Sequence, residues 1–342
     1  MKKLILSAAL VALVAAPLSA QWKTAYPDIP RVDVHIHIAS YDAAPAYLQL
    51  HDNLSARYDA DLAALVSVDT REGPVESPAE MLRVSENRIL SAFSDFEPQK
   101  GPHHTMADFQ TMKDKGFAGY KIWFGPYYRV MPEGEKGISI DADAYQPIFD
   151  AAYTTSLPIL SMHINDPNGP FDARGKWMAD PVMFWQGVHA AENAIARNPG
   201  VTFVVAHGFW LVCQDAQLDY LRYLLATYPN LYVDLAATFQ YFYLVNPDNL
   251  RDLMIEYSDR VLFGTDGGVL AVDRLDGTAD RYAKVFRILE TDQVVDGGYF
   301  GNRDTQGLNL PREVLENIYY KNALKLYPGL RAAMAANGYD VE

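Results

Sequence analysis

The first predicted strand has the sequence Val32-Asp33-Val34-His35-Ile36-His37-Ile38. It places two imidazoles two residues apart in a run that is apolar except for Asp33. Because side chains alternate along a β-strand, His35 and His37 leave the backbone on one side. The valines and isoleucines leave on the other side and are expected to pack against helices. Two neutral imidazoles held side by side supply half of a tetrahedral or five-coordinate metal site. A pair of hydrogen-bonded core histidines is the alternative reading of an isolated His-x-His.

Short apolar, β-branched runs recur along the chain and alternate with segments of helical spacing. The predicted strands cover residues 32–38, 62–69, 89–96, 118–124, 158–164, 202–207, 231–235 and 261–266. The predicted helices include residues 181–197, 216–227, 248–257 and 280–289. Strands that alternate with helices pair in parallel, and eight such units predict an α/β fold of the closed (β/α)8 TIM-barrel type. A doubly wound open sheet is the alternative. The tail after Gly307, with residues 311–327, predicts an extra C-terminal helix over the barrel.

The first twenty residues have the pattern of a bacterial signal peptide. A basic start at residues 1–3 precedes an apolar run at 4–17 and small residues at 18–20. We therefore expect residues 1–20 to be removed, and residues 21–342 to form a single TIM-barrel domain that is periplasmic or secreted. An uncleaved anchor is the alternative. No cysteine stands at the cleavage point, which argues against lipidation there.

Composition narrows the classes of partner. The formal net charge is −14, which argues against nucleic acid and against anionic membrane surfaces. Cys213 is the single cysteine, so no intrachain disulfide can form, and stability must come from the core. We expect a small-molecule substrate, no membrane association after cleavage, and leave a homo-oligomer open.

Polar residues stand at the ends of several predicted strands, where TIM barrels carry their catalytic groups. His163 ends the fifth strand, His207 the sixth and Asp266 the eighth, so four of the eight histidines lie at strand ends. Several imidazoles with a carboxylate are a sensible ligand set for a divalent ion, and zinc is the default. For Asp266, which precedes two glycines, a turn or helix-capping role is the structural alternative.

An Asp-x-His-x-His first strand, histidines ending strands five and six, and Gly-Thr-Asp-Gly at strand eight resemble the amidohydrolase superfamily, and in particular its amidohydrolase-related (amidohydrolase 2) branch. The resemblance spans nearly the whole mature chain. It implies His35, His37, His163 and Asp266 as metal ligands, with Asp266 also a proton shuttle. It implies that His207 polarises the substrate, contacts water or binds a second ion. The branch contains metal-dependent hydrolases and also non-oxidative decarboxylases of aromatic or enol acids.

Lys121 is predicted to point into the barrel, because Tyr120, Ile122 and Phe124 form the opposite, apolar face of its strand. A buried lysine is costly unless it is paired or chemically used. Three alternatives stay open: a carboxylated lysine bridging two ions, as in two-metal members of the superfamily; a cation that holds a substrate carboxylate; and an ion pair with Asp69 or Asp95.

Weaker candidates lie in the loops and on neighbouring strands. The loops could contribute an arginine or aromatic rings over the metal, although solvation or surface pairing explains these residues equally well: His103, His104, Tyr127, Tyr128, Arg129, Arg174 and Trp177. Arg129 is the substrate-binding candidate among them. Asp33 is expected to be a hydrogen-bond acceptor behind the metal ligands, and Asp234 an inward-facing residue with no role beyond lining.

These features together predict an exported metal-dependent hydrolase, with one or two ions, that activates water for attack on a small ester, lactone or amide carbonyl. In this scheme Asp266 moves the proton and His207 helps to stabilise the developing oxyanion. The second hypothesis is a metal-dependent decarboxylase of a small aromatic or enol acid. The third is a non-catalytic binding barrel with a closed metal site.

Overall fold

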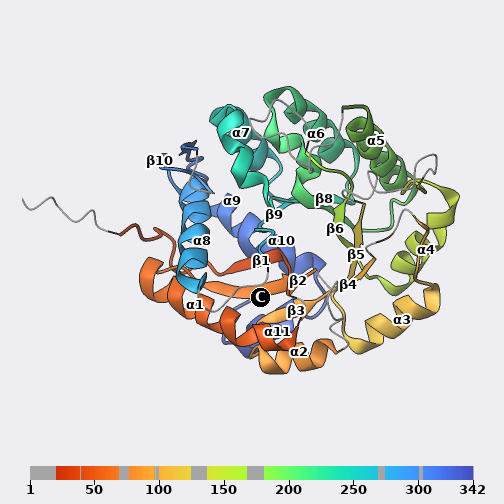
Figure 1. Cartoon of the computed structure of the whole chain (residues 1–342), viewed down its shortest axis with the longest axis horizontal. Helices are drawn as coiled ribbons and strands as arrows, with labels where there is room; N and C mark the ends of the chain where they lie inside the picture. Colours follow the sequence, from red (N-terminus) through yellow and green to blue (C-terminus); the bar gives the residue numbers. More distant parts are fainter. Residues whose placement is uncertain are drawn as a thin grey trace, which may run out of the picture.

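The parallel strands of the chain lie towards the centre of the molecule and the helices surround them (Figure 1). The structure is a computed structural model, and it describes residues 21–38, 40–68, 77–95, 97, 100–124, 137–167, 181–268, 274–299 and 303–341. Its barrel strands are β1 (Arg31–Ile36), β2 (Leu62–Ser67), β3 (Ile89–Ser91), β4 (Phe93–Asp95), β5 (Tyr120–Trp123), β6 (Ile159–His163), β7 (Phe203–Val205), β8 (Leu231–Asp234) and β9 (Val261–Leu262).

All neighbouring barrel strands pair in parallel, in the order in which they occur in the sequence. Only Ala92 separates β3 from β4, so these two segments together occupy one strand position of the barrel. The barrel closes between its first and last strands, where the amide of Val34 donates to Phe263 O (3.0 Å) and the amide of Asp266 donates to His35 O (2.9 Å). The predicted eight-unit TIM barrel is confirmed.

The helices follow the strands in alternation. They are α1 (Ala44–Tyr58), α2 (Pro78–Val84), α3 (Met106–Lys115), α4 (Gln146–Thr155), α5 (Pro181–Arg197), α6 (Asp215–Thr227), α7 (Pro247–Glu256) and α8 (Leu275–Glu290). Local signals explain several boundaries: Thr105 and Asp108 form a capping box at the start of α3, and Gly116 ends it with φ 90°. The four predicted helices correspond to α5 through α8, with α8 beginning earlier than expected. No helix in the described part of the chain is long and apolar enough to cross a membrane.

The C-terminal part of the chain is helical, as predicted, but less regular. It comprises α9 (Arg312–Glu316), a π-helical turn (Asn317–Lys321), α10 (Asn322–Leu326) and α11 (Leu330–Ala336), and a short antiparallel pair, β10 (Val294–Val295) and β11 (Thr305–Gln306), precedes it. Asn322 donates from Nδ2 to the carbonyls of Ser258 (2.7 Å) and Val261 (2.8 Å). These bonds attach the C-terminal helices to the start of β9.

A buried ion pair joins the same region to β1 and α8. The Arg31 guanidinium lies 2.8 Å from a carboxylate oxygen of Glu290, and both side chains are fully buried. The Tyr319 hydroxyl donates to the same carboxylate (2.9 Å), and the guanidinium stacks over the rings of Phe286 and Tyr319. Three segments far apart in sequence therefore meet at one charge pair.

The β1 strand corrects one prediction. Val32 and Val34 do not face the helices; they belong to a buried cluster with Leu90, Leu160 and Val204 from other strands, which places them inside the barrel. The pairing of β1 with β2 shifts register between Asp33 and Ile36. This irregularity lets consecutive residues face the same side, so strict alternation fails along β1. The predicted outward direction holds for Ile36 and Ile38.

The proposed division at residue 20 stays a prediction, because residues 1–20 lie outside the described part of the chain.

Candidate metal centre and active site

The predicted site residues come together at the carboxyl ends of the barrel strands. His35 lies in β1 with His37 just beyond its end, His163 is the last residue of β6, and His207 and Asp266 follow β7 and β9. This placement follows directly from parallel pairing, which collects the ends of all strands at one rim of the barrel.

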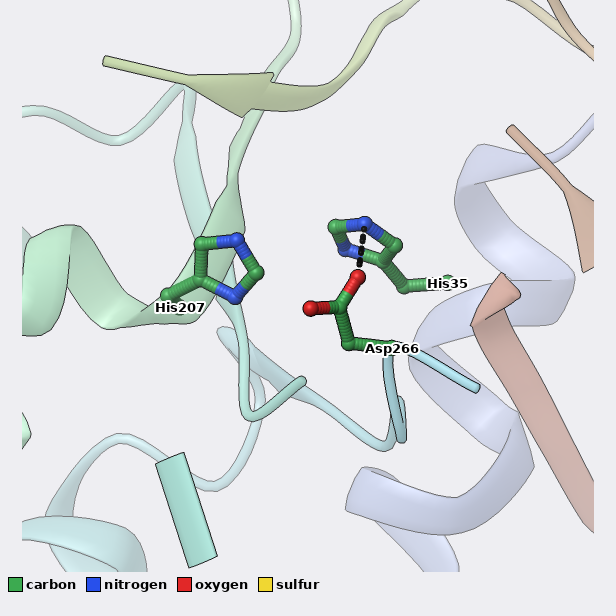
Figure 2. A group of neighbouring side chains, drawn as sticks. All are labelled: His35, His207 and Asp266. Carbon is green, nitrogen blue, oxygen red and sulfur yellow. Dashed lines mark ion pairs between the residues drawn. The ribbon is translucent and has the colours of Figure 1, made fainter. Parts of the chain in front are cut away.

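Three of these residues converge most closely. His35, His207 and Asp266 each offer a ligand atom, and these atoms lie within 4.8 Å of one another (Figure 2). Asp266 Oδ1 lies 3.3 Å from His35 Nε2 and 2.9 Å from His37 Nε2. His163 joins the group through its Nδ1, which lies 3.0 Å from His207 Nε2. All five predicted residues thus share one site, and the triplet whose ligand atoms all lie within 4.8 Å of one another contains His207 rather than His37 or His163.

Hydrogen bonds define the tautomers of two of the imidazoles. His207 Nδ1 lies 2.7 Å from the carbonyl oxygen of Ala236, so Nδ1 must carry the proton and Nε2 must be an acceptor. His163 Nδ1 then donates to His207 Nε2, which leaves a lone pair on His163 Nε2. That nitrogen is buried and has no hydrogen-bond partner among the described residues. In its neutral form His207 therefore cannot donate to an oxyanion from Nε2, which disfavours that part of the predicted mechanism.

Asp234, expected only to line the barrel, organises the site. It is fully buried at the end of β8, and its Oδ2 lies 2.9 Å from His35 Nδ1. Its Oδ1 accepts hydrogen bonds from the amides of His207 (2.9 Å) and Ala236 (3.1 Å). The sequence predicts that the Asp234 carboxylate faces into a barrel whose strands end in histidines. It does not predict which of these histidines the carboxylate contacts.

Asp33 is turned away from the metal ligands. Its carboxylate accepts hydrogen bonds from the side chains of Thr265 and Tyr282, the latter on α8, and from the amide of His35 (3.1 Å). Asp33 is a hydrogen-bond acceptor, as predicted, but it accepts from the backbone amide of His35 and not from an imidazole ring. The register shift in β1 is the reason, because it breaks the alternation that would have placed Asp33 and His35 on one side.

The backbone around the site is unusually constrained. His207, Gly208, Phe209 and Trp210 all have φ between 53° and 62°, a left-handed run that non-glycine residues rarely adopt. Such conformations persist where surrounding contacts hold them, and they concentrate at functional sites. The Trp210 ring stacks on His207 with centroids 4.3 Å apart and donates from Nε1 to Asn165 O (2.8 Å).

A glycine makes room for one ligand. A Cβ atom at Gly264 would lie 3.0 Å from His35 Cβ and 3.3 Å from Ala236 Cβ. A side chain there would crowd His35 and Ala236, and one of these residues would have to shift. The Gly-Thr-Asp-Gly segment therefore needs its first glycine for packing.

Burial keeps the imidazoles neutral. Burial, together with the nearby Lys121 ammonium, lowers the pKa of His35 to about 4. Burial and the adjacent His163 ring lower the pKa of His207 to about 4. The same burial, together with Lys121, holds the pKa of His163 well below its ordinary value. Neutral imidazoles have the lone pairs that a metal ion requires.

The carboxylate of Asp266, which lies beside these imidazoles, stays ionised. Burial would raise the pKa of its carboxyl, but the hydrogen bond with His37 and the surrounding imidazoles hold it well below its ordinary value. Its side chain is 30% exposed, so it borders open space and can meet a substrate. An ionised carboxylate that reaches open space can accept a proton from water.

A cavity of about 270 Å³ opens over the site. It is lined by the ligand candidates and by newly identified residues: His35, His37, Lys121, Trp123, His163, Asp166, Pro167, Trp210, Ala237, Gln240, Tyr241 and Asp266. Asp166 is the acidic residue that the sequence analysis overlooked; it follows His163 by three positions, and its Oδ1 lies 3.9 Å from His163 Nε2. The volume suits a small molecule.

Lys121 points into the barrel, as predicted, and is fully buried. Its Nζ lies 3.4 Å from His35 Nε2. The alternative partner Asp95 instead binds the side chains of His103 (3.0 Å) and Tyr120 (3.2 Å), on the helix-facing side of β5. This geometry favours a chemical role for Lys121 over the Asp95 ion pair, and Asp69 lies outside the described residues.

The loop candidates are not part of the described site. His103 pairs with Asp95, and His104 packs edge-on against Phe93 and Tyr120, away from the cavity. The remaining loop candidates lie outside the described residues: Tyr127, Tyr128, Arg129, Arg174 and Trp177.

The residues present fit a divalent ion. Neutral imidazoles with lone pairs on His35 and His163, and an ionised carboxylate on Asp266, form the mixed nitrogen and oxygen donor set that zinc accepts. The unpartnered, buried His163 Nε2 supports the fit, because buried polar atoms are normally satisfied. The site could therefore bind a metal ion.

Comparison with known proteins supports the same interpretation. The family model of the amidohydrolases, Amidohydro_2, matches residues 32–329 of the chain. No curated protein matches the sequence of the chain.

Several solved structures share the fold. The chain is similar to a 2,6-dihydroxybenzoate decarboxylase complexed with 2,6-dihydroxybenzoate, at 15% identity and TM-score 0.51, with 87% of this chain and 98% of that chain covered. It is similar to an uncharacterised TIM-barrel protein from Bordetella bronchiseptica, at 14% identity and TM-score 0.50, with 90% and 99% covered. A 4-oxalomesaconate hydratase from Rhodopseudomonas palustris shows 14% identity and TM-score 0.50, with 90% and 98% covered. At these identities the likeness concerns the fold alone.

Proposed function

Because this chain belongs to the amidohydrolase family, we propose that it is a metal-dependent hydrolase acting on the carbonyl of a small ester, lactone or amide. The observation that carries the proposal is the convergence of ligand atoms from His35, His207 and Asp266 within 4.8 Å, beneath a cavity of about 270 Å³. A solvent-accessible carboxylate beside neutral imidazoles is the arrangement that metal-assisted hydrolysis requires.

Zinc is the ion that we propose. His35, His37, His163 and Asp266 would hold it, with His207 close enough to contribute. A bound divalent ion supplies Lewis-acid polarisation of a carbonyl and lowers the pKa of water.

The protein residues then divide the remaining work. Asp266 Oδ1, oriented by His37 at 2.9 Å, takes a proton from the attacking water and returns it to the leaving group. The Lys121 ammonium is a donor that can face developing negative charge, a role that neutral His207 cannot fill from Nε2. Trp123, Trp210 and Tyr241 supply apolar walls that exclude water around the substrate.

Metal removal tests the proposal. Dialysis against a chelator is expected to abolish ester, lactone or amide hydrolysis, and added zinc is expected to restore it. Elemental analysis gives the stoichiometry: about one ion favours Lys121 as a cation for substrate, and about two favour its carboxylation into a bridge. Full activity in metal-free protein would disprove the metal-dependent mechanism.

A decarboxylase is the second candidate. Lys121 and three aromatic side chains line the same cavity, which would suit a planar carboxylate, and one structural neighbour is a decarboxylase. The two candidates differ in their products. Release of carbon dioxide from a carboxylated phenol or enol, without hydrolysis of any ester, lactone or amide, would favour decarboxylation.

We also propose that the protein is exported, on the basis of residues 1–20. An intact mass that begins at Gln21 in the periplasmic fraction of an expressing bacterium supports this proposal. A mass that retains Met1 or Lys2 in that fraction contradicts cleavage.

A further inference from the structure

The end of β8 contacts two of the candidate ligands at once. Asp234 is fully buried, and its two carboxylate oxygens have different partners: Oδ2 faces the His35 ring, and Oδ1 faces the backbone that carries His207. Two residues later, the Ala236 carbonyl accepts the Nδ1 proton of His207. A single strand end therefore contacts both imidazoles.

The contact with His35 determines where its proton lies. An ionised carboxylate can only accept a hydrogen bond, and the shorter contact of the His35 ring is that of Nδ1 with Asp234 Oδ2, at 2.9 Å. On the other side of the ring, Nε2 lies 3.4 Å from the Lys121 ammonium, which can only donate. The geometry therefore assigns the proton to Nδ1. The lone pair is then on Nε2, the nitrogen that lies 3.3 Å from Asp266 Oδ1. Without this contact either tautomer of His35 could form, and one of them has no lone pair on the side of Asp266.

The contact between Asp234 and His207 stabilises an unfavourable backbone conformation of His207. His207 has φ 59° and begins the left-handed run, and its amide donates to Asp234 Oδ1 at 2.9 Å. The amide of Ala236 donates to the same oxygen at 3.1 Å, so the carboxylate links the ends of β7 and β8.

We propose that Asp234 is a positioning residue that makes His35 Nε2 available to the metal by selecting the His35 tautomer, and that it also holds the His207 backbone in place beside the site. This inference rests on the proposed metal-dependent function but is separable from it, because the tautomer can be measured without metal. Carboxylates that accept the second imidazole proton of a ligand orient the ring and increase its basicity.

The Asp234→Asn variant is expected to change the tautomer of His35 without changing the fold. Asparagine can keep its oxygen toward the two amides, and its Nδ2 then faces His35 Nδ1 as a donor. His35 must accept there, and its proton must move to Nε2. The opposite amide orientation would oppose Nδ2 to two amide donors. The exchange thus preserves the backbone contacts and removes the lone pair near Asp266.

Two measurements test the proposal. In metal-free protein with labelled histidines, assigned with a His35→Gln spectrum, nitrogen chemical shifts are expected to show the Nδ1-protonated tautomer of His35 in the wild type. The Asp234→Asn variant is expected to show the Nε2-protonated form. Zinc affinity, measured by competition with a chromophoric chelator, is expected to fall about 10- to 100-fold in the variant.

Asp95→Asn is the matched control. Asp95 is also a buried strand-end carboxylate that binds a histidine Nδ1, that of His103 at 3.0 Å, but it lies outside the cavity. Its exchange is expected to leave zinc affinity and the His35 signal unchanged.

The outcomes are distinct. An Nε2-protonated His35 in the wild type overturns the proposal, even if the variant fails to fold. Unchanged zinc affinity in a folded Asp234→Asn protein also overturns it, as does an equal loss of affinity in Asp95→Asn. If the wild type binds no zinc, the proposed function fails, and the tautomer measurement alone decides the role of Asp234.

Discussion

Asp266 combines a left-handed backbone with a carboxylate that borders the cavity. Its φ is 59°, and its amide donates to the carbonyl of His35 across the closing seam of the barrel. Asparagine and aspartate tolerate this conformation better than most residues. The position can therefore be changed from carboxylate to amide with little change to the backbone.

The exchange Asp266→Asn is expected to preserve the fold and most of the metal while lowering kcat by several powers of ten, because an amide cannot take a proton from water. Steady-state kinetics with metal-loaded protein, alongside elemental analysis, check this. Asp95→Asn should retain wild-type turnover. Near wild-type turnover in Asp266→Asn would rule out the proton-shuttle role.

At this scale the sequence predicted the group of residues better than their individual roles. His35, His37, His163, His207 and Asp266 were all assigned to one rim of the barrel, and the structure places them there. Their tautomers depend on groups far away in the sequence, such as the Ala236 carbonyl beside His207. No local pattern encodes those contacts.

Strand β1 shows what periodicity can and cannot establish for an element. Alternation correctly placed Ile36 and Ile38 against the helices but misplaced Val32 and Val34. The register shift between Asp33 and Ile36 depends on pairing with β2, which a single strand does not reveal. Alternation succeeded in β5, where Lys121 faces inward and Tyr120 outward, and both are fully buried.

The buried pair of Arg31 and Glu290 fixes the start of β1 to the end of α8. Replacing Glu290 by glutamine leaves a buried guanidinium without its countercharge, which costs about 3–5 kcal/mol. Urea denaturation is expected to show this loss of the free energy of unfolding.

The surface pair of Arg222 and Glu256, with side chains 25% and 51% exposed, provides the control. Glu256→Gln should change stability little, because water and salt screen exposed charges. Equal effects of the two exchanges would contradict the assigned importance of burial.

In the whole molecule, the C-terminal helices complete the barrel. Asn322 is fully buried and satisfies two carbonyls near the start of β9, and the amide of Phe263 donates to Ile318 O (2.9 Å) in the π-helical turn. A strand as short as β9 thus gains part of its hydrogen bonding from a helix rather than from a neighbouring strand.

The exchange Asn322→Ala is expected to lower the free energy of unfolding by about 2 kcal/mol or more, since it leaves two buried carbonyls without a donor. Chemical denaturation measures the loss. Asn337→Ala removes similar side-chain bonds, to the carbonyls of Glu86 and Asn87, but near the surface, where water can replace them. A loss in Asn337→Ala as large as that in Asn322→Ala would contradict this explanation.

The barrel, and the rim on which its polar residues gather, can be predicted from the amino-acid sequence alone. Both follow from local periodicity and from the alternation of strand and helix, which nearby residues encode. Three features could not be predicted in this way: which imidazole nitrogens have lone pairs, the orientation of Asp33 away from the ligands, and the contact of Asp234 with His35. Those outcomes depend on register between strands and on hydrogen bonds between segments up to hundreds of residues apart, and such contacts exist only once the barrel has closed.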